Sequence, residues 1–571
     1  MSCDEIPMDV LFSEGSSSST APTSPSSSPL VHPSEIDDLK LSQLPQVRNV
    51  LEEYPRDLSV KDVCFIGAGY VGGPTAAVLA LHNPAVTVEV LDRDPRRIQQ
   101  WKSPHLPVHE PGLDALVRAV RKDSEDESQS PTQRQQNLIF SCDSARALAK
   151  ADIIFMAVNT PTKMFGVGAG CATNMTAFDG AMRDVATYAK AGAIIVEKST
   201  VPGGTADRVR KMLAASRPGV PFEVLSNPEF LAEGSAVENL TTPDRVLIGS
   251  AATPSGRQAA RTLASLYTAW VPSDRILETN TWSSELAKLV ANAMLAQRIS
   301  SINSISAICE RTGAEVDQVA KAIGLDARIG PQFLKAGLGF GGSCFRKDIA
   351  SLAYLAESLG LDDVADYWRQ VNIMNERQRD RFAHKVISRF DGNLVGHKLA
   401  ILGFAFKKNT GDTRESLAAD VIRVLLEERP SEIAIFDPFC RADDIMRELK
   451  NVCPDVSERD VVKIHTDPYL ACSQAHAILV VTDCDQFRNT PGKKPIWTHN
   501  SNFVQSCARD CTDCRAHSTR PTTEAIEWPR IAYNMVEPKW VFDGRGLLDV
   551  AELEKLGVRV DSVGRRSTVS F

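Results

Sequence analysis

Residues 60–72 read Val60-Lys61-Asp62-Val63-Cys64-Phe65-Ile66-Gly67-Ala68-Gly69-Tyr70-Val71-Gly72, a short β-rich run that leads directly into a glycine turn. The helix-forming run Pro74–Ala80 follows at once, and a second predicted strand, Thr87–Leu91, ends before Asp92. A strand, a glycine turn, a helix and a second strand ending in an acid are the order of a dinucleotide-binding unit. The sequence therefore predicts an α/β fold with a parallel sheet.

Each part of this motif has a chemical task. Gly67 and Gly69 allow a tight turn, and they let a pyrophosphate approach the N-terminus of the following helix. Asp92 lies 20 residues beyond Gly72 and is placed to accept a hydrogen bond from a ribose 2′-hydroxyl. The acid favours NAD over NADP. The alternative is a glycine turn in an α/β domain that binds no cofactor, and the matched spacing argues against it.

Two later apolar runs also end in polar loops. One run ends before Asn159 and the other ends before Ser199. Because ligands bind outside the carboxyl ends of the strands in an open parallel sheet, both loops are expected to border the cofactor. The alternative is that Asn159 and Ser199 only cap the helices that follow.

The stretch Asn227-Pro228-Glu229-Phe230-Leu231-Ala232-Glu233-Gly234 follows another predicted strand. Its two carboxylates are four residues apart, so Glu229 and Glu233 would share one face if this stretch is a first helical turn. Acids at a helix start are also favoured by the helix dipole alone. The pattern therefore leaves a functional and a purely structural interpretation open.

The longest helical pattern in the chain runs from Asn280 to about Arg311. Lys288 and Asn292 lie four residues apart and share one face of this helix. Because a lysine in apolar surroundings needs a charged or hydrogen-bonding partner, we predict that Lys288 belongs to a site. A long apolar helix between two α/β units is also a natural dimer surface.

Residues Gly339–Asp348 place Cys344 in what the glycines predict to be a flexible loop. Lys347 follows the cysteine by three residues and Asp348 follows it by four. Glycine lets a backbone approach a ligand closely, so the thiol can be presented to a substrate. A single cysteine is more often a small buried hydrophobe, and the surrounding motifs are what favour a nucleophile.

A second α/β unit is predicted after this loop. A strand with a glycine turn is expected at His397–Lys408, and further strands are expected at Glu432–Asp437, Ala477–Thr482 and Trp540–Arg545, with a helix at 417–428. Two mononucleotide-type units imply two nucleotide ligands, of which one would be the cofactor and the other the substrate.

The composition is that of a soluble globular protein. The 571 residues are 43% hydrophobic and 24% charged, with a net charge of −8, which gives no reason to expect nucleic acid or an anionic membrane as a partner. No secretory signal or membrane span is predicted. Thirteen cysteines, an odd number, indicate reduced thiols and a cytoplasmic location.

Four segments are expected along the chain. Residues 1–56 are predicted to be a disordered Ser/Pro-rich tail, 57–279 an NAD-binding domain, 280–390 a central helical domain with the cysteine loop, and 391–571 a second nucleotide-binding domain. A polar insertion at about 488–523 interrupts the last one. It contains possible zinc ligands, although a metal-free insertion is the favoured interpretation and no other metal site is predicted: Cys507, Cys511, Cys514 and His517.

About residues 57–563 resemble the UDP-glucose/GDP-mannose dehydrogenase family, and within it the UDP-glucose 6-dehydrogenases. The segments that carry the resemblance are 227–234, 282–292, 339–348, 403–416 and 542–545. The resemblance implies two Rossmann-like doubly wound domains joined by a long central helix, and it implies that the second of them, 391–571, binds the UDP-sugar. It also implies oxidation of UDP-glucose to UDP-glucuronate with reduction of two NAD⁺. Three rivals are a GDP-mannose dehydrogenase, a UDP-N-acetylhexosamine dehydrogenase and a catalytically silent scaffold.

The resemblance also implies roles for single residues. Cys344 would be the nucleophile that forms a thiohemiacetal and then a thioester, which is hydrolysed. Lys288 would be the base of the alcohol step and, with Asn292, would stabilise oxyanions. The other catalytic assignments are Glu229 for thioester hydrolysis, Asp348 for support of water and lysine, and Thr200 at the border of the site.

The remaining assignments concern the two ligands. On the cofactor side the resemblance implies Gly67, Ala68, Gly69, Tyr70, Val71, Gly72, Asp92, Arg97, Val158, Asn159, Thr160, Pro161, Thr162, Ser199, Thr200, Val201, Glu233, Lys347 and Arg414. On the substrate side it implies Glu229, Phe230, Leu231, Ala232, Glu233, Lys288, Asn292, Arg328, Phe333, Leu334, Lys335, Gly339, Phe340, Gly341, Phe406, Lys407 and Arg545. Arg328 is expected to reach the active site of a neighbouring subunit, which implies a homodimer or a higher homo-oligomer.

Overall fold

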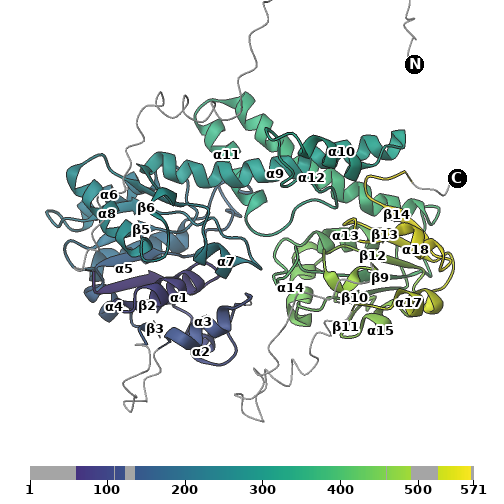
Figure 1. Ribbon diagram of the computed structural model, residues 1–571, viewed down its shortest axis with the longest axis horizontal. Coiled ribbons are helices and arrows are strands. Elements are labelled where there is room, and N and C mark those ends of the chain that lie inside the picture. Colours follow the sequence, from purple (N-terminus) through teal and green to yellow (C-terminus); the bar gives the residue numbers. More distant parts are fainter. Residues whose placement is uncertain (1–59, 109, 122–135, 458–459, 490–524, 567–571) are drawn as a thin grey trace, which may run out of the picture. The chain divides into compact units, whose positions relative to one another are not determined.

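The computed structural model describes residues 60–108, 110–121, 136–457, 460–489 and 525–566. They form an eight-stranded sheet, a set of long helices and a six-stranded sheet (Figure 1). The predicted tail at 1–56 lies outside the described residues. So do Cys507, Cys511, Cys514 and His517, with most of the predicted insertion.

The first sheet has the strand order β3-β2-β1-β4-β5-β6-β7-β8. Neighbouring strands are parallel except for β6 and β7. The order reverses between β1 and β4, which is where a doubly wound sheet leaves a crevice for a dinucleotide. The strands are β1 (Asp62–Ile66), β2 (Thr87–Leu91), β3 (Leu138–Ser141), β4 (Ile153–Met156), β5 (Ile194–Glu197), β6 (Glu223–Ser226), β7 (Val246–Ser250) and β8 (Ile276–Asn280).

The helices of this part pack on both faces of the sheet. Phe65 and Phe155 stack at 4.3 Å within the apolar cluster of one face, whereas Ile154 belongs to a separate cluster on the other. Burial on both faces explains why the central strand β4 is apolar throughout. The helices are α1 (Gly72–His82), α2 (Pro95–Lys102), α3 (Leu113–Val120), α4 (Ser144–Lys150), α5 (Thr176–Tyr188), α6 (Thr205–Ser216), α7 (Ala236–Thr241) and α8 (Pro254–Tyr267).

Four helices lie between the two sheets in the chain: α9 (Thr281–Thr312), α10 (Val316–Gly324), α11 (Phe345–Ser358) and α12 (Asp362–Ser388). The long helix predicted from Asn280 is confirmed as α9. The Asn280 side chain caps it by accepting a 2.7 Å hydrogen bond from the backbone N–H of Ser283, and Gly313 ends it with φ +84°. Figure 1 shows α12, which the sequence analysis did not identify, beside α9.

The second sheet is wholly parallel, in the order β11-β10-β9-β12-β13-β14. The four predicted strands are confirmed as β9, β10, β12 and β13, and the predicted helix is confirmed as α13. The elements are β9 (Lys398–Leu402), α13 (Leu417–Glu427), β10 (Glu432–Phe436), α14 (Ala442–Val452), β11 (Val462–His465), α15 (Pro468–Cys472), β12 (Ala477–Val480), α17 (Trp528–Asn534), β13 (Trp540–Asp543), α18 (Val550–Glu554) and β14 (Arg559–Ser562).

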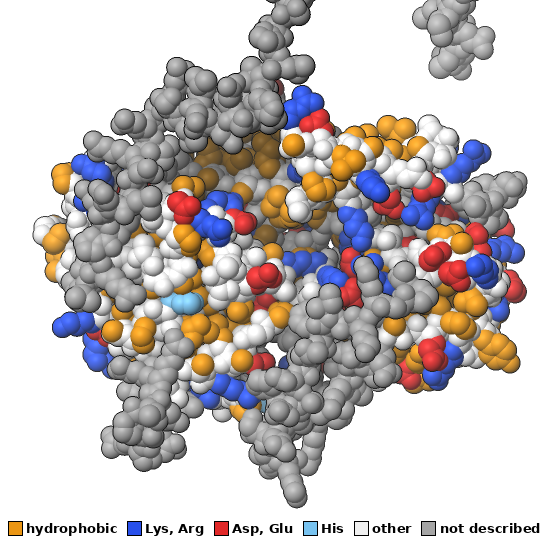
Figure 2. Space-filling model, in the orientation of Figure 1, with side chains coloured by type: hydrophobic (Ala, Val, Ile, Leu, Met, Phe, Trp, Pro, Cys, Tyr) orange, Lys and Arg blue, Asp and Glu red, His pale blue; other side chains and the backbone are white. Residues whose placement is uncertain are grey.

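Charge is distributed without separation over the face in Figure 2, where Lys and Arg side chains alternate with Asp and Glu. None of the described helices is long and apolar enough to cross a membrane.

Candidate active site

Lys288 and Glu229 form a buried ion pair. Lys288 projects from α9, and its Nζ lies 3.0 Å from Oε1 of Glu229, which follows β6. Burial disfavours charge on both groups, but their mutual attraction outweighs it. The pKa of Lys288 is therefore raised, with further help from Asp348 and Cys344, and the pKa of Glu229 is lowered, with help from the N–H of Leu231. Both groups are ionised near neutral pH.

Asn292 is linked to the start of α11. Its amide donates a 2.6 Å hydrogen bond to Oδ2 of Asp348, while Nζ of Lys347 lies 2.5 Å from Oδ1 of the same carboxylate. Asp348 is only 1% exposed. Lys288, Asn292 and Asp348 therefore belong to one buried polar cluster, which joins α9 to α11.

Cys344 stands at the first turn of a helix. The prediction of a flexible loop extending to Asp348 was wrong, because α11 begins at Phe345 and Cys344 occupies its N-cap position. The pKa of the thiol is raised to about 12, mainly because burial disfavours the thiolate and also because Glu233, Glu229 and Asp348 repel it; Lys288 acts in the opposite direction. The thiol is protonated in this state of the site.

The stretch from Asn227 to Gly234 is not a helical turn, so the expectation that its two acids share a helix face was wrong. Residues 227–232 are irregular, and α7 begins at Ala236. Glu229 turns to Lys288, whereas Glu233 pairs with Lys407 at 3.1 Å. Pro228 disfavours helix for Asn227.

The glycines before Cys344 face other parts of the protein. A Cβ on Gly341 would lie 2.6 Å from the carbonyl oxygen of Glu415, and one on Gly342 would lie 2.5 Å from the ring of Phe406. Gly342 also has φ +84°. These positions need glycine because the segment after β9 packs directly against them.

Several substrate-side candidates also meet near this loop. Arg545 donates to the carbonyl oxygens of Gly339 (3.0 Å) and Val481 (2.7 Å), and its burial lowers its pKa to about 10. The backbone N–H and carbonyl of Phe340 bond to the Asn375 side chain, both at 2.8 Å. The loop is thereby fixed from two sides.

Other substrate-side candidates are more exposed. Lys335 pairs with Asp483 at 3.1 Å, and Phe333 has φ +62° beside the buried Leu334. Arg328 lies away from the cluster around Lys288, because its guanidinium pairs with Asp326 at 2.6 Å and its side chain is 89% exposed.

The glycine turn after β1 has room for a dinucleotide. A Cβ on Gly67 would clash with the carbonyl of Ala157, and one on Gly72 would clash with the carbonyl of Gly67, whereas a Cβ on Gly69 would meet nothing within 4 Å. The turn is therefore tight on its protein side and open at Gly69, where a phosphate would approach.

A cleft of about 230 Å³ adjoins this turn. Asp92 lines it and accepts a 3.0 Å hydrogen bond from the N–H of Ala68, and Arg97 lies 3.5 Å from the Asp92 carboxylate. Val158 and Asn159 line the same cleft. These residues fit an adenosine and its diphosphate, with Asp92 at the ribose.

The loops after β4 and β5 are bonded to each other. Ser199 donates to the carbonyl of Val158 at 2.6 Å, and Thr160 donates to the carbonyl of Thr200 at 2.8 Å. The capping alternative was wrong, because Met175 and Gly204 occupy the N-cap positions of α5 and α6. Pro161, Thr162 and Val201 lie in the same two loops.

Arg414 reaches the glycine turn from the segment after β9. Its guanidinium pairs with Asp412 at 2.5 Å and lies 5.2 Å from the centre of the Tyr70 ring. Tyr70 and Val71 lie between the open Gly69 and the start of α1. The contact places Arg414 at the edge of the region predicted to hold the cofactor.

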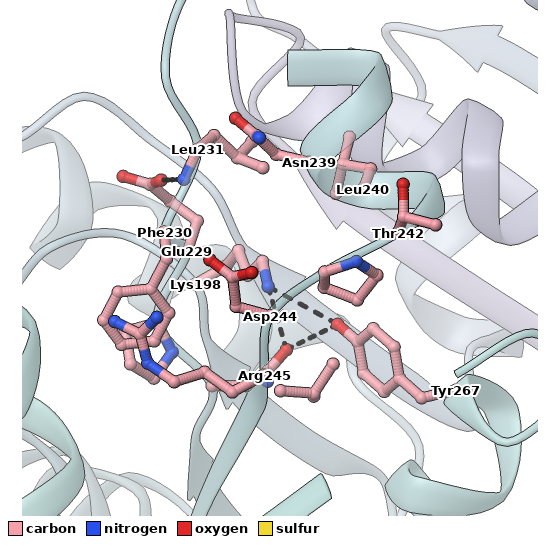
Figure 3. A pocket seen from close by; sticks show the side chains of 14 residues that line it. Lys198, Glu229, Phe230, Leu231, Asn239, Leu240, Thr242, Asp244, Arg245 and Tyr267 are labelled. Carbon is pink, nitrogen blue, oxygen red and sulfur yellow. Dashed lines mark hydrogen bonds between the residues drawn. The ribbon is translucent and has the colours of Figure 1, made fainter. Parts of the chain in front are cut away.

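One buried group escaped the sequence analysis. Lys198, at the end of β5, bonds to Asn227 and Tyr267 and lines a pocket of about 80 Å³ with Glu229 (Figure 3). The signal was present in the sequence, since a lysine follows the apolar strand Ile194–Glu197 at the edge where parallel sheets bind ligands.

Comparison with known proteins places the chain in a family. The model of the NAD binding domain of the UDP-glucose/GDP-mannose dehydrogenase family matches residues 61–271, its central domain matches 282–377, and its UDP binding domain matches 400–513. These matches confirm the resemblance seen in the motifs.

Individual members of this family are also similar to the chain over most of its length. The chain is 44% identical over 510 residues to UDP-glucose 6-dehydrogenase of Drosophila melanogaster, covering 88% of this chain and 96% of the relative. It is 45% identical over 508 residues to UDP-glucose 6-dehydrogenase of Caenorhabditis elegans, covering 88% and 95%. The solved UDP-glucose dehydrogenase of Pyrobaculum islandicum matches with a TM-score of 0.68 and 29% identity, over 90% of this chain and 99% of that one. The chain therefore belongs to the UDP-glucose/GDP-mannose dehydrogenase family, and its cofactor is NAD.

Proposed function

We propose that the protein oxidises the C6 alcohol of UDP-glucose to the carboxylate of UDP-glucuronate. The observation that carries the proposal is the buried cluster of Lys288, Glu229, Asn292 and Asp348 beside the thiol of Cys344. It offers a nucleophile, a cation and two carboxylates in one place. Relatives named UDP-glucose 6-dehydrogenase support the choice of sugar nucleotide.

Lys288 stabilises the alkoxide in the first oxidation. Its raised pKa keeps it an ammonium in the resting site, so we assign it the stabilisation of negative charge, with Glu229 or water as the route for the departing proton. Asn292 donates its amide to developing oxyanions. NAD⁺, when bound, accepts one hydride in each of the two oxidations.

Cys344 retains the substrate between the oxidations. The Cys344 thiol adds to the aldehyde: sulfur bonds to the carbon and the S–H proton passes to the carbonyl oxygen, which gives a thiohemiacetal. Loss of the hydroxyl proton and of a second hydride from the carbon gives a thioester. Glu229 directs water to the thioester carbon, the carbon–sulfur bond breaks, and Cys344 is regenerated. One water is consumed and three protons are released for each carboxylate formed and two NAD⁺ reduced. Asp348 holds Asn292 and Lys347 in place, and Thr200 borders the reacting carbon.

We propose the following division of the chain. The segment 57–279 binds NAD through the glycine turn and the loops after β4 and β5, with Glu233, Lys347 and Arg414 at its border. The segment 391–571 binds the UDP moiety through Phe406, Lys407 and Arg545, and Lys335 contributes from the central segment 280–390. Leu231 and Ala232 line the sugar side with Phe230.

We also propose a homodimer in which Arg328 completes the active site of the second subunit. Two observations support it. The Arg328 side chain is exposed and bonds only to Asp326 among the described residues. Apolar side chains of the central segment are also exposed: Met294 and Ile308 on α9, and Leu325 and Ile329 in the turns after α10. A cytoplasmic location is proposed from the odd number of cysteines.

The direct test is incubation of the purified protein with NAD⁺ and, separately, UDP-glucose, GDP-mannose and UDP-N-acetylmannosamine. We expect two NADH for each UDP-glucuronate and slower turnover with the other sugars. No reduction with any sugar would refute the proposed activity, and a preference for another sugar would refute the substrate.

Cys344→Ser tests the covalent scheme. We expect loss of glucuronate formation in this variant, and in the wild-type protein we expect a covalent adduct on the Cys344 peptide after rapid quenching in acid. Native production of free glucuronate by Cys344→Ser would contradict a thioester intermediate.

A further inference from the structure

Lys198 is a buried ammonium with neutral partners. It is 5% exposed, and its Nζ donates to Oδ1 of Asn227 (3.1 Å) and to the hydroxyl of Tyr267 (3.4 Å). Among the described residues, no carboxylate lies close enough to Nζ of Lys198 to form an ion pair with it. A cation in such surroundings is costly unless charge of opposite sign acts on it from farther away.

The hydrogen bonds of Lys198 converge on the segment that carries Glu229. Tyr267 donates a 2.7 Å bond to the same Oδ1 of Asn227, and the Asn227 amide donates a 2.8 Å bond to the carbonyl of Leu247. Asn227 is fully buried and lies two residues before Glu229. The side chains of Lys198, Tyr267 and Asn227 therefore fix the position of the backbone just before Glu229.

Glu229 and Lys198 also interact through their charges. They line the same small pocket, and Lys198 is among the groups that lower the pKa of Glu229, after Lys288 and the N–H of Leu231. In return, burial lowers the pKa of Lys198 to about 8, with Glu229 opposing this change and Lys288 adding to it. Glu229 is thus the carboxylate that balances Lys198.

We propose that Lys198 is a positioning residue for the dehydrogenase reaction: it holds the segment Asn227–Phe230 through Asn227 and Tyr267, and it acts as a second cation that keeps Glu229 ionised. The proposal rests on the proposed function, because it assigns Lys198 to the step that Glu229 serves. With Lys288 alone, one cation would have to bind Glu229 and also stabilise the oxyanions of the substrate. Lys198 contributes to the first task, so Glu229 does not depend on Lys288 alone.

Other charged groups also surround Glu229. Lys288 faces it from α9, and Asp348 and Cys344 approach Lys288 from the start of α11. Arg245, before β7, lies 3.8 Å from the centre of the Phe230 ring, next to the exposed Asp244. Asp244 and Arg245 line the pocket with Glu229 and Lys198. Lys288 and Lys198 both lower the pKa of Glu229, Lys288 more strongly.

The test compares Lys198→Met, Lys198→Arg and Tyr267→Phe in the full-length protein with UDP-glucose and NAD⁺. For Lys198→Met we expect kcat to fall about tenfold, KM for UDP-glucose to change less than threefold, and the acidic limb of the kcat–pH profile to move to higher pH. Lys198→Arg keeps the positive charge, so the acidic limb of its kcat–pH profile should lie at the wild-type pH. Tyr267→Phe removes a hydrogen bond without changing the charge, so the acidic limb of its profile should also lie at the wild-type pH.

An unchanged acidic limb and kcat in Lys198→Met would overturn the inference. Equal shifts in Lys198→Met and Tyr267→Phe would overturn it too, because they would indicate a packing defect. If Lys198→Met does not fold, Lys198→Gln supports the same measurement, since it retains a polar group without charge. Failure of the wild-type protein to reduce NAD⁺ would instead reject the proposed function, so the two failures are distinguishable.

Discussion

Nζ of Lys288 and Oε1 of Glu229 lie 3.0 Å apart, in side chains that are 4% and 9% exposed. The two residues are 59 positions apart in the chain and come from a helix and an irregular segment. Each makes burial of the other possible, because an isolated buried charge is costly.

Breaking this pair should reduce both stability and activity. Lys288→Met removes the cation that pairs directly with the buried Glu229, so we expect about 3–5 kcal/mol loss in the free energy of unfolding and a fall in kcat of roughly 100-fold or more. The double variant Lys288→Met/Glu229→Gln should recover most of the stability in urea unfolding but none of the activity. If the double variant is as unstable as Lys288→Met, the unpaired charge of Glu229 is not the cause of the lost stability.

The same pair predicts how stability depends on pH. The pKa of Glu229 is lowered by folding, so its contribution is present above its unfolded value of about 4.3 and is lost as pH falls through the folded value. The pKa of Lys288 is raised, so its contribution is present below about 10.4 and is lost as pH rises through the folded value.

Urea unfolding between pH 3 and 7 checks the acidic side. The wild-type protein should lose stability more steeply on acidification than Glu229→Gln, which has no carboxyl group to protonate. Parallel curves for the two proteins would contradict the prediction.

Gly342 should resist substitution because of its neighbour and not only because of its backbone. Gly192 provides a matched control, since it also has φ +84° but a Cβ there would meet nothing within 4 Å. Gly192→Ala should cost roughly 1 kcal/mol of unfolding free energy through backbone strain. Gly342→Ala should cost about 1–3 kcal/mol more through the clash with Phe406. Equal losses in thermal or urea unfolding would show that the Phe406 contact is unimportant.

Cys344 should react slowly with iodoacetamide at neutral pH, because burial and three carboxylates raise its pKa to about 12. Glu233→Gln removes the carboxylate that contributes most among them and should accelerate alkylation several-fold. Mass spectrometry of the Cys344 peptide measures the rate, with the exposed Cys142 as an internal reference. An unchanged ratio of the two rates would contradict the assigned influence of Glu233.

The shared active site can be tested by hybrid dimers. Cys344→Ser and Arg328→Ala should each be nearly inactive alone. A hybrid dimer of the two has one site with both native residues and one with neither, so co-expression should restore about half of the activity per hybrid. Size-exclusion chromatography checks that hybrids form. Absence of any recovery in isolated hybrids would refute the role of Arg328 across subunits.

The sequence was most informative where local signals agree. Asn280 and Gly313 delimit α9 by their capping geometry, and both are residues that favour those positions. The glycine turn at Gly67 could be predicted because only glycine tolerates that conformation and that approach to Ala157. The need of Lys288 for a partner followed from its apolar surroundings and is confirmed by the contact with Glu229.

Other features could not be predicted from local pattern. The start of α11 was missed because Cys344 makes no side-chain cap, so the usual Ser, Thr, Asp or Asn signal is absent. The acids Glu229 and Glu233 diverge because their cations, Lys288 and Lys407, come from different parts of the chain.

The sequence by itself determined the strand–turn–helix order of the two α/β units and the long helix, because these depend on short-range periodicity, caps and glycine conformations. The doubly wound strand order and most of the candidate site residues were implied by the family resemblance. Only the tertiary structure decided which charges face each other. It pairs Glu229 with Lys288, bonds Asn292 to Asp348, and bonds Lys198 to Asn227 in the segment that carries Glu229. Such pairings depend on burial between distant segments, where a charge is stable only with its partner, and no local pattern encodes that distance.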